Sequence, residues 1–152
     1  MAEEKMYGSL ANWFHLITHP KDYEEEAAIF SRVFLEEGAE VTTLLELGSG
    51  GGNNASHMKR HFEITLVDRS EAMLELSKTL NPENEHIVGD MCTVRLDKQY
   101  DGVFIHDAIS YLKTEDELRA ALETAYLHCR KGGRALFVPD HTQETFKEST
   151  SH

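Results

Sequence analysis

The sequence has little cysteine, proline or positive charge, and each shortage argues against a class of protein. Its 152 residues include 2 cysteines and 3 prolines. Two distant cysteines cannot form a disulfide framework, so we expect a reducing, cytoplasmic environment. With 15 Lys and Arg against 27 Asp and Glu, the net charge is −12, which argues against a nucleic-acid partner. There is no apolar run of about 18 residues and no cationic N-terminal signal, so no membrane partner is expected.

What is present is a regular alternation of short apolar runs and helical patterns, without repeats or linkers. The predicted strands are 41–47, 64–68, 86–89, 102–106 and 134–138, and the predicted helices are 21–37, 53–59, 71–78 and 115–129. Thr114 is the expected N-cap of the last helix, and Gly132-Gly133 its expected end. Strands that alternate with helices pair in parallel and are covered on both faces. The sequence therefore predicts one doubly wound α/β domain.

The strongest local signal is a glycine cluster between a predicted strand and a predicted helix. It reads Glu46-Leu47-Gly48-Ser49-Gly50-Gly51-Gly52-Asn53. Glycines in such a turn adopt positive φ and let a ligand approach bare backbone. The dinucleotide pattern G-x-G-x-x-G fails in the frame that starts at Gly48, because position 53 is Asn, but the frame from Gly50 meets the allowed variant Ala55. The glycines alone leave a nucleotide possible.

The pattern Glu46-x-Gly48-x-Gly50-x-Gly52 resembles the first motif of the class I S-adenosylmethionine-dependent methyltransferases. Four more stretches resemble the family's later motifs, in the family's order: Val67-Asp68-Arg69-Ser70, Gly89-Asp90-Met91, Tyr100-Asp101-Gly102-Val103-Phe104 and Lys131-Gly132-Gly133-Arg134. They extend over residues 41–140, and the small-molecule N-methyltransferases are the most similar group. The resemblance implies a Rossmann-like sheet of strand order 3-2-1-4-5, S-adenosylmethionine as cofactor and a small-molecule acceptor.

Family positions also suggest how the cofactor is held. Asp68 follows Gly48 by 20 residues, the spacing at which an acid accepts ribose hydroxyls; alternatively, Asp68 or Ser70 caps the next helix. The resemblance implies that Asp90 and the Met91 amide bind adenine. The remaining cofactor residues expected from the family are Tyr7, Tyr23, Glu46, Gly48, Ser49, Gly50, Gly52, Arg69, Met73, His106 and Asp107.

Two histidines follow predicted strands at the edge where chemistry occurs in such sheets. His106 ends the fourth strand and His141 follows the fifth. In an in-line methyl transfer the enzyme aligns the acceptor, and a histidine near its ordinary pKa can take the acceptor proton. We therefore expect His106, and with lower rank His141, to be catalytic; the alternative is that His106 only packs against the glycine turn. No metal site is expected, since the spaced pairs His15/His19 and His57/His61 lack a third ligand.

The N-terminal 1–40 is predicted to be a helical lid or cap on a core of 41–152. In related enzymes the corresponding segment covers the cofactor, and Tyr7 or Tyr23 is in place to contact the cofactor carboxylate. The family's usual C-terminal antiparallel strand pair is missing, so the edge of the fifth strand is predicted to be free for a homodimer. Two other functions stay open: a cofactor-binding module without turnover, and a nicotinamide-dependent oxidoreductase.

Overall fold

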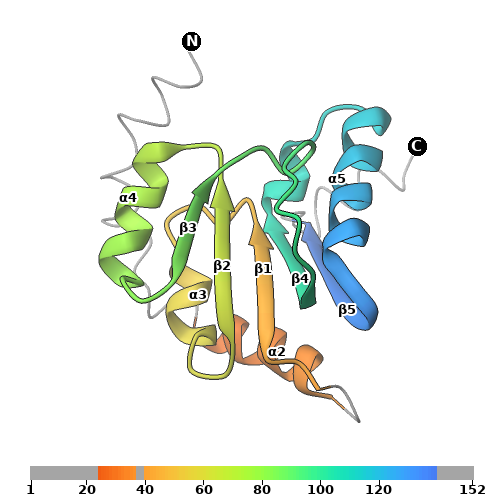
Figure 1. Cartoon of the computed structure of the whole chain (residues 1–152). Helices are drawn as coiled ribbons and strands as arrows, with labels where there is room; N and C mark the ends of the chain where they lie inside the picture. The colour runs from red at the N-terminus through yellow and green to blue at the C-terminus, as the bar shows by residue number, and fades with distance from the viewer. Residues whose placement is uncertain (1–23, 37–39, 140–152) are drawn as a thin grey trace, which may run out of the picture.

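The structure is a computed structural model, and it describes residues 24–36 and 40–139. Five strands form one sheet in the order β3-β2-β1-β4-β5 (Figure 1). The strands are β1 (Thr43–Leu47), β2 (Glu63–Asp68), β3 (Glu85–Val88), β4 (Tyr100–Asp107) and β5 (Cys129–Pro139). Every strand pairing within the described residues is parallel. The predicted strand order and parallel pairing are confirmed.

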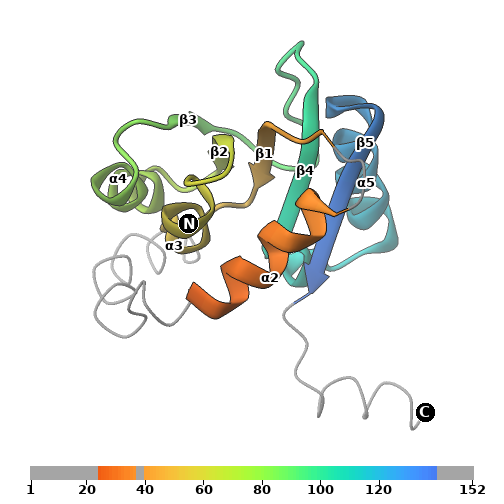
Figure 2. The same cartoon turned by 90° about the horizontal axis from the view of Figure 1, so that it is seen from below.

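Helices cover both faces of this sheet, as predicted. They are α2 (Glu24–Leu35), α3 (Asn53–Met58), α4 (Glu71–Leu80) and α5 (Glu115–His128), with the short 3-10 helix η2 (Ala108–Tyr111) after β4. Figure 2 shows α2, α3 and α4 on one face and α5 on the other. In the described part of the chain no helix is long and apolar enough to cross a membrane.

Alternating side chains of β1 contribute to two apolar cores, one on each face. Leu44 packs with Phe30 and Phe34 of α2 on the first face. Leu45 packs with Ala125 of α5 on the second. Burying a side chain of this size contributes about 1.5–3 kcal/mol. The α2 helix therefore shares a core with the sheet and lies along β4, where Phe30 and Phe34 both contact Phe104.

Of the helices that follow strands, α4 and α5 are capped at their starts by hydroxyl side chains. Thr114 Oγ1 accepts the amide hydrogen of Glu117 at 3.0 Å, so the predicted cap is confirmed. Ser70 Oγ accepts the amide hydrogen of Met73 at 3.2 Å and caps α4. Of the two cap candidates for α4, the structure therefore selects Ser70 and leaves Asp68 available for another role.

The predicted end of α5 is wrong. The helix ends at His128, and β5 begins at Cys129, so Gly132 and Gly133 lie inside the strand. A Cβ atom on Gly133 would lie 2.5 Å from the carbonyl oxygen of Asp101, so glycine is required where β5 passes β4. These glycines serve a close approach of two backbones and a register shift in the β4–β5 pairing.

Candidate functional site

The glycine turn between β1 and α3 is anchored to the neighbouring strand β2. The amides of Gly48 and Ser49 both donate to the carbonyl of Val67, at 2.8 and 3.0 Å. Gly50 and Gly52 have φ values of 58° and 77°, in the left-handed region that favours glycine. The turn lies at the carboxyl edge of the sheet, beside the end of β2, where ligands bind in open α/β sheets.

The carboxylate of Asp68 is hydrogen-bonded to this turn. Its Oδ2 accepts the Gly50 amide at 2.8 Å, and its Oδ1 accepts the Ser70 amide at 2.9 Å. The residue is 8% exposed. Burial raises the pKa of this carboxyl, while the Ser70 and Gly50 amides and the charge of Arg69 oppose the rise. Each oxygen keeps a second lone pair, so the carboxylate can still accept two hydroxyl hydrogens.

Two methionines border the turn from opposite faces of the sheet. Met73 extends from α4, and a Cβ atom on Gly50 would lie 3.6 Å from its Cε. Met91 follows β3 and packs with the core of the α5 face, and a Cβ atom on Gly48 would lie 2.9 Å from its Cε. The structure therefore brings both predicted methionines to the turn.

His106 lies on the α2 face, where its ring is held from both sides. Its Nδ1 lies 2.9 Å from Asn54 Nδ2, and its Nε2 lies 2.9 Å from Glu26 Oε1. The ring stacks on Phe104 at 5.9 Å between centroids and contacts Phe30 at 5.1 Å. Because an amide NH₂ only donates, Nδ1 accepts from Asn54, and Nε2–H donates to the carboxylate. His106 and Glu26 therefore act as a pair.

The other predicted residues occupy varied environments. Glu46 is buried within β1, at 4% exposure, next to Leu66 and Phe104 in the sheet register. Asp90 is exposed, and its carboxylate accepts the Cys92 amide at 2.8 Å. Arg69 is exposed. Tyr7, Tyr23, His141 and the Asp107 side chain lie outside what the structure describes.

Five residues near the site were not predicted from the sequence. Glu26 and Asn54 hold His106, and Ser77, Asn81 and His86 connect α4 and β3 to the turn. Asn54 offered a signal, because it directly follows the glycine cluster. Glu26 offered none, because it is one of three consecutive glutamates that read as a solvated helix start.

Metal ligands are not gathered in the part of the chain that the structure describes. No three His, Cys, Asp or Glu side chains there lie close enough to hold a metal ion. His15 and His19 fall outside the described residues. The arrangement instead combines a glycine turn, whose bare backbone a ligand can approach closely, with a buried carboxylate, and these features suit a polar organic ligand.

Comparison with known proteins gives the family. Residues 45–137 match the family model described as a methyltransferase domain. A curated relative from Streptomyces venezuelae, dTDP-3-amino-3,4,6-trideoxy-alpha-D-glucopyranose N,N-dimethyltransferase, is 30% identical over 130 residues. The match covers 84% of this chain and 55% of the relative, so the chain spans about half of that relative's length.

Solved structures agree. The crystal structure of Streptomyces venezuelae DesVI has a TM-score of 0.79 at 28% identity, covering 91% of this chain and 59% of that one. CalS10, an amino pentose methyltransferase from Micromonospora echinaspora with bound SAM, has a TM-score of 0.75 at 27% identity. That match covers 80% of this chain and 52% of CalS10. The matched residues extend from the end of β1 into β5 and contain the whole glycine turn, and on this basis the chain belongs to the methyltransferase domain family.

Proposed function

We propose that this chain binds S-adenosylmethionine at the glycine turn and transfers its methyl group to a small-molecule acceptor. The observation that carries the proposal is the bond from the Gly50 amide to the Asp68 carboxylate at 2.8 Å. This bond brings a buried carboxylate beside a backbone that a ligand can approach closely, which supports a role for Asp68 as the acceptor of ribose hydroxyls. The match to the methyltransferase domain family and the similarity to a curated N,N-dimethyltransferase support the proposal.

The residues around the turn fit such a cofactor. The Ser49 hydroxyl oxygen and the side-chain oxygens of Asn53 and Asn54 are buried and have no hydrogen-bond partner among the described residues. Buried polar atoms in native proteins are normally paired, so a polar ligand at this turn accounts for them. Among the described residues, a Cβ atom on Gly50 would contact only Met73, at 3.6 Å, an ordinary van der Waals distance.

The predicted cofactor residues receive the following roles in the proposal. Asp68 accepts the ribose hydroxyls, and Met73 packs on the purine. Asp90 and the Met91 amide bind adenine. Arg69, which directly follows Asp68 in the chain, is also expected to contact the cofactor. Glu46 and the backbone of Gly48 to Gly52 lie against the methionine part, and Tyr7 or Tyr23 contacts its carboxylate. The expected role of the turn's amides as ligand donors is not supported, because those of Gly48, Ser49, Gly50 and Gly52 are already bonded within the protein. The N-terminal segment 1–40 serves as a lid over the core 41–152.

When bound, the cofactor supplies a methyl group on a sulfonium, ready for in-line displacement. The chain aligns the acceptor's lone pair and excludes water. We assign the acceptor proton to the Glu26 carboxylate, which is 45% exposed and is held by the Nε2–H of His106. The ring itself keeps no free lone pair, because its Nδ1 accepts from Asn54. His141 remains a further candidate for a catalytic role, and Asp107 a candidate for cofactor binding.

An amine on a sugar is the acceptor that we favour. The Streptomyces venezuelae relative is named as an N,N-dimethyltransferase of an amino sugar nucleotide, and CalS10 as an amino pentose methyltransferase. A half-exposed glutamate beside a histidine suits a basic nitrogen, which must lose a proton before or after transfer. Hydroxyl acceptors are the second candidate, because the same carboxylate can take a hydroxyl proton.

A turnover assay tests the proposal. The chain is incubated with isotopically labelled S-adenosylmethionine and either an amino sugar nucleotide or its hydroxyl counterpart. We expect labelled product from the amine alone. Label in the hydroxyl compound would make the enzyme an O-methyltransferase. Cofactor binding without product would support the binding-module alternative, and binding of NADH instead would support an oxidoreductase.

Two further parts of the proposal concern assembly and location. The β5 strand is an edge of the sheet and pairs with β4 alone among the described strands, so we propose a homodimer through this edge.

Cys92 and Cys129 are both free thiols, which suits the cytoplasm, the location that we propose.

A further inference from the structure

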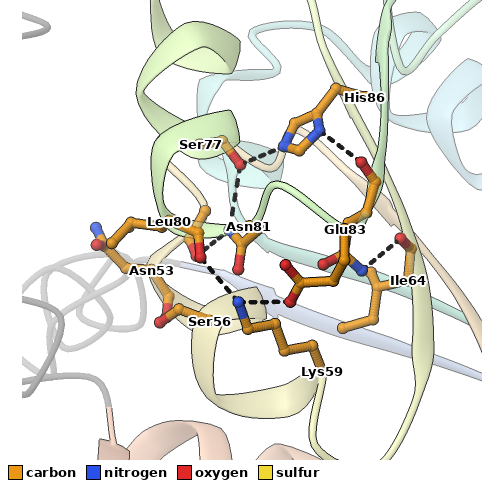
Figure 3. A network of polar contacts seen from close by, with 11 residues as sticks. Asn53, Ser56, Lys59, Ile64, Ser77, Leu80, Asn81, Glu83 and His86 are labelled. Carbon is orange, nitrogen blue, oxygen red and sulfur yellow. Dashed lines mark hydrogen bonds and ion pairs between the residues drawn. The ribbon is translucent and has the colours of Figure 1, made fainter.

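We propose that Asn81, oriented by Ser77 and His86, is a positioning residue that holds the glycine turn in its ligand-binding conformation from the α4 side. The inference rests on the proposed cofactor site. Figure 3 shows Ser77, Asn81 and His86 in one connected network between α4 and β3. None of the three was expected to act at the turn.

The contact between Asn81 and the turn is direct and buried. Asn81 is fully buried, and its Nδ2 donates to the carbonyl oxygen of Gly52 at 3.1 Å. The same carbonyl accepts the Ser56 amide at 3.0 Å and so begins α3, which has no side-chain cap. Asn81 therefore supports the residue at which the turn becomes a helix.

Packing at Gly52 is as tight as the hydrogen bonding. A Cβ atom on Gly52 would lie 2.2 Å from Ser77 Oγ and 2.5 Å from Asn81 Nδ2. With φ at 77°, Gly52 holds a left-handed conformation that most residues avoid. The side chains of Ser77 and Asn81 thus pack directly against the backbone of Gly52 and support its left-handed conformation.

The donors and acceptors of the network follow in a fixed order. A carbonyl oxygen only accepts, so His86 Nδ1 carries the hydrogen that reaches the Asn84 carbonyl at 3.0 Å. His86 Nε2 then accepts from the Ser77 hydroxyl at 2.8 Å. Ser77 Oγ in turn accepts from Asn81 Nδ2 at 3.4 Å. Both amide hydrogens of Asn81 are therefore used, one on Ser77 and one on Gly52.

Asn81 is better explained by positioning than by stability. Its own Oδ1 is buried and has no partner among the described residues. An unpaired buried oxygen costs stability, and an apolar side chain of similar size would avoid that cost. What the asparagine adds is a pair of donors, one of which meets the turn.

Protonation of His86 would reverse the direction of its hydrogen bond with Ser77. Burial lowers the pKa of His86, while Lys78 and Glu75 on α4 act on it in opposite directions. Its neighbour in register on β2, Leu66, is apolar. A charged imidazole would donate to Ser77, and the buried Ser77 hydroxyl would lose its acceptor. Asn81 is therefore expected to be held less firmly in its orientation at a pH below the ordinary histidine pKa.

The experiment is a calorimetric titration with S-adenosylhomocysteine at about pH 8 and at a series of lower pH values that continues well below the ordinary histidine pKa, because burial lowers the pKa of His86. Asn81→Leu should weaken binding about fivefold or more at the higher pH, the loss expected for one hydrogen bond. Its urea unfolding midpoint should not fall. His86→Gln should lose part of the pH dependence, because glutamine does not titrate in this range.

Glu83→Gln is the matched control. Glu83 pairs with Lys59 at 2.6 Å in the same region (Figure 3). The atoms nearest a Cβ atom on Gly52 belong to Ser77 and Asn81, so the replacement of Glu83 should leave affinity unchanged. Unaltered affinity in Asn81→Leu, or a pH dependence that His86→Gln leaves intact, would overturn the proposal.

Hydrogen exchange on the ligand-free chain separates this proposal from the cofactor assignment. The Ser56 amide, which donates to the Gly52 carbonyl, should exchange faster in Asn81→Leu than in the unchanged chain or Glu83→Gln. If the chain binds no S-adenosylhomocysteine but this exchange increases, the cofactor assignment fails and the positioning role stands. If the exchange is unchanged, the positioning role fails.

Discussion

The carboxylate of Asp68 accepts the amide hydrogen of Gly50 across 2.8 Å and joins the end of β2 to the turn that follows β1. The same carboxylate accepts the Ser70 amide at the start of α4. One side chain thus ties three elements at the proposed cofactor site. Burial makes ionisation of the Asp68 carboxyl unfavourable, so the ionised form lowers the free energy of unfolding.

The first prediction concerns the pH dependence of stability at Asp68. Burial raises its pKa above the ordinary value of 3.8. The folded state therefore binds the proton more tightly than the unfolded state. This contribution to stability is full below pH 3.8 and is lost as the pH rises through the folded pKa. Urea unfolding of Asp68→Asn should lack this loss, and an identical pH profile in both proteins would contradict it.

Asp101 should behave in the opposite sense. Its Oδ2 accepts the amides of Thr42 and Thr43, and its Oδ1 accepts Arg130 Nε at 2.6 Å. The Thr42 amide is the largest of the causes that lower its pKa. The stabilisation is therefore present above the ordinary value of 3.8 and is lost as the pH falls through the lower folded pKa.

Replacing Asp101 tests this prediction. Asp101→Ala should lower the free energy of unfolding by about 2 kcal/mol at neutral pH, the scale of hydrogen bonds to a charged group. Affinity for S-adenosylhomocysteine should change little, because Asp101 lies at the amino ends of the strands, away from the turn. The exposed Glu123 on α5 supplies the control, and Glu123→Ala should leave stability nearly unchanged. Equal effects of the two changes would refute the role of Asp101.

The next prediction concerns His106 and Glu26, whose side chains meet at 2.9 Å. If Glu26 takes the acceptor proton while His106 holds it in place, His106→Ala should slow methyl transfer by about a hundredfold or more. Affinity for the cofactor product should stay within a few-fold. Glu26→Gln should slow transfer in the same direction. If His106→Ala lowers both the cofactor affinity and the rate of methyl transfer, His106 serves in packing or cofactor binding and not in proton transfer.

The edge of β5 provides a prediction about assembly. Ala135 is exposed in the middle of this strand, and a lysine there would oppose pairing with a second copy. Sedimentation equilibrium should show self-association of the unchanged chain and a monomer for Ala135→Lys. A strictly monomeric unchanged chain would rule out the proposed dimer.

Much of the fold could be predicted because the decisive signals are local. The apolar run before Gly48 and the cap at Thr114 fix element types within a few residues. The α5–β5 junction could not be predicted in this way. The glycines there are required by the distant backbone of Asp101, and a helix stop and a close backbone approach use the same residue type.

The site was predictable to the extent that it lies on one continuous motif. Asp68 could be placed beside the turn from its spacing to Gly48, and the structure brings it to Gly50. Asn81 could not, because an asparagine before Pro82 at a helix end also has an ordinary role in a turn. Its bond to Gly52 joins residues 29 positions apart, which only the tertiary structure specifies.

The most direct test of the central claim is a calorimetric titration of S-adenosylhomocysteine, and separately of NADH, into the unchanged chain and Asp68→Ala. The account predicts that S-adenosylhomocysteine binds and NADH does not. It also predicts that Asp68→Ala weakens binding by about 1–3 kcal/mol, the scale of a charge-assisted hydrogen bond. Unaltered affinity in Asp68→Ala, or binding of NADH in place of S-adenosylhomocysteine, would contradict it.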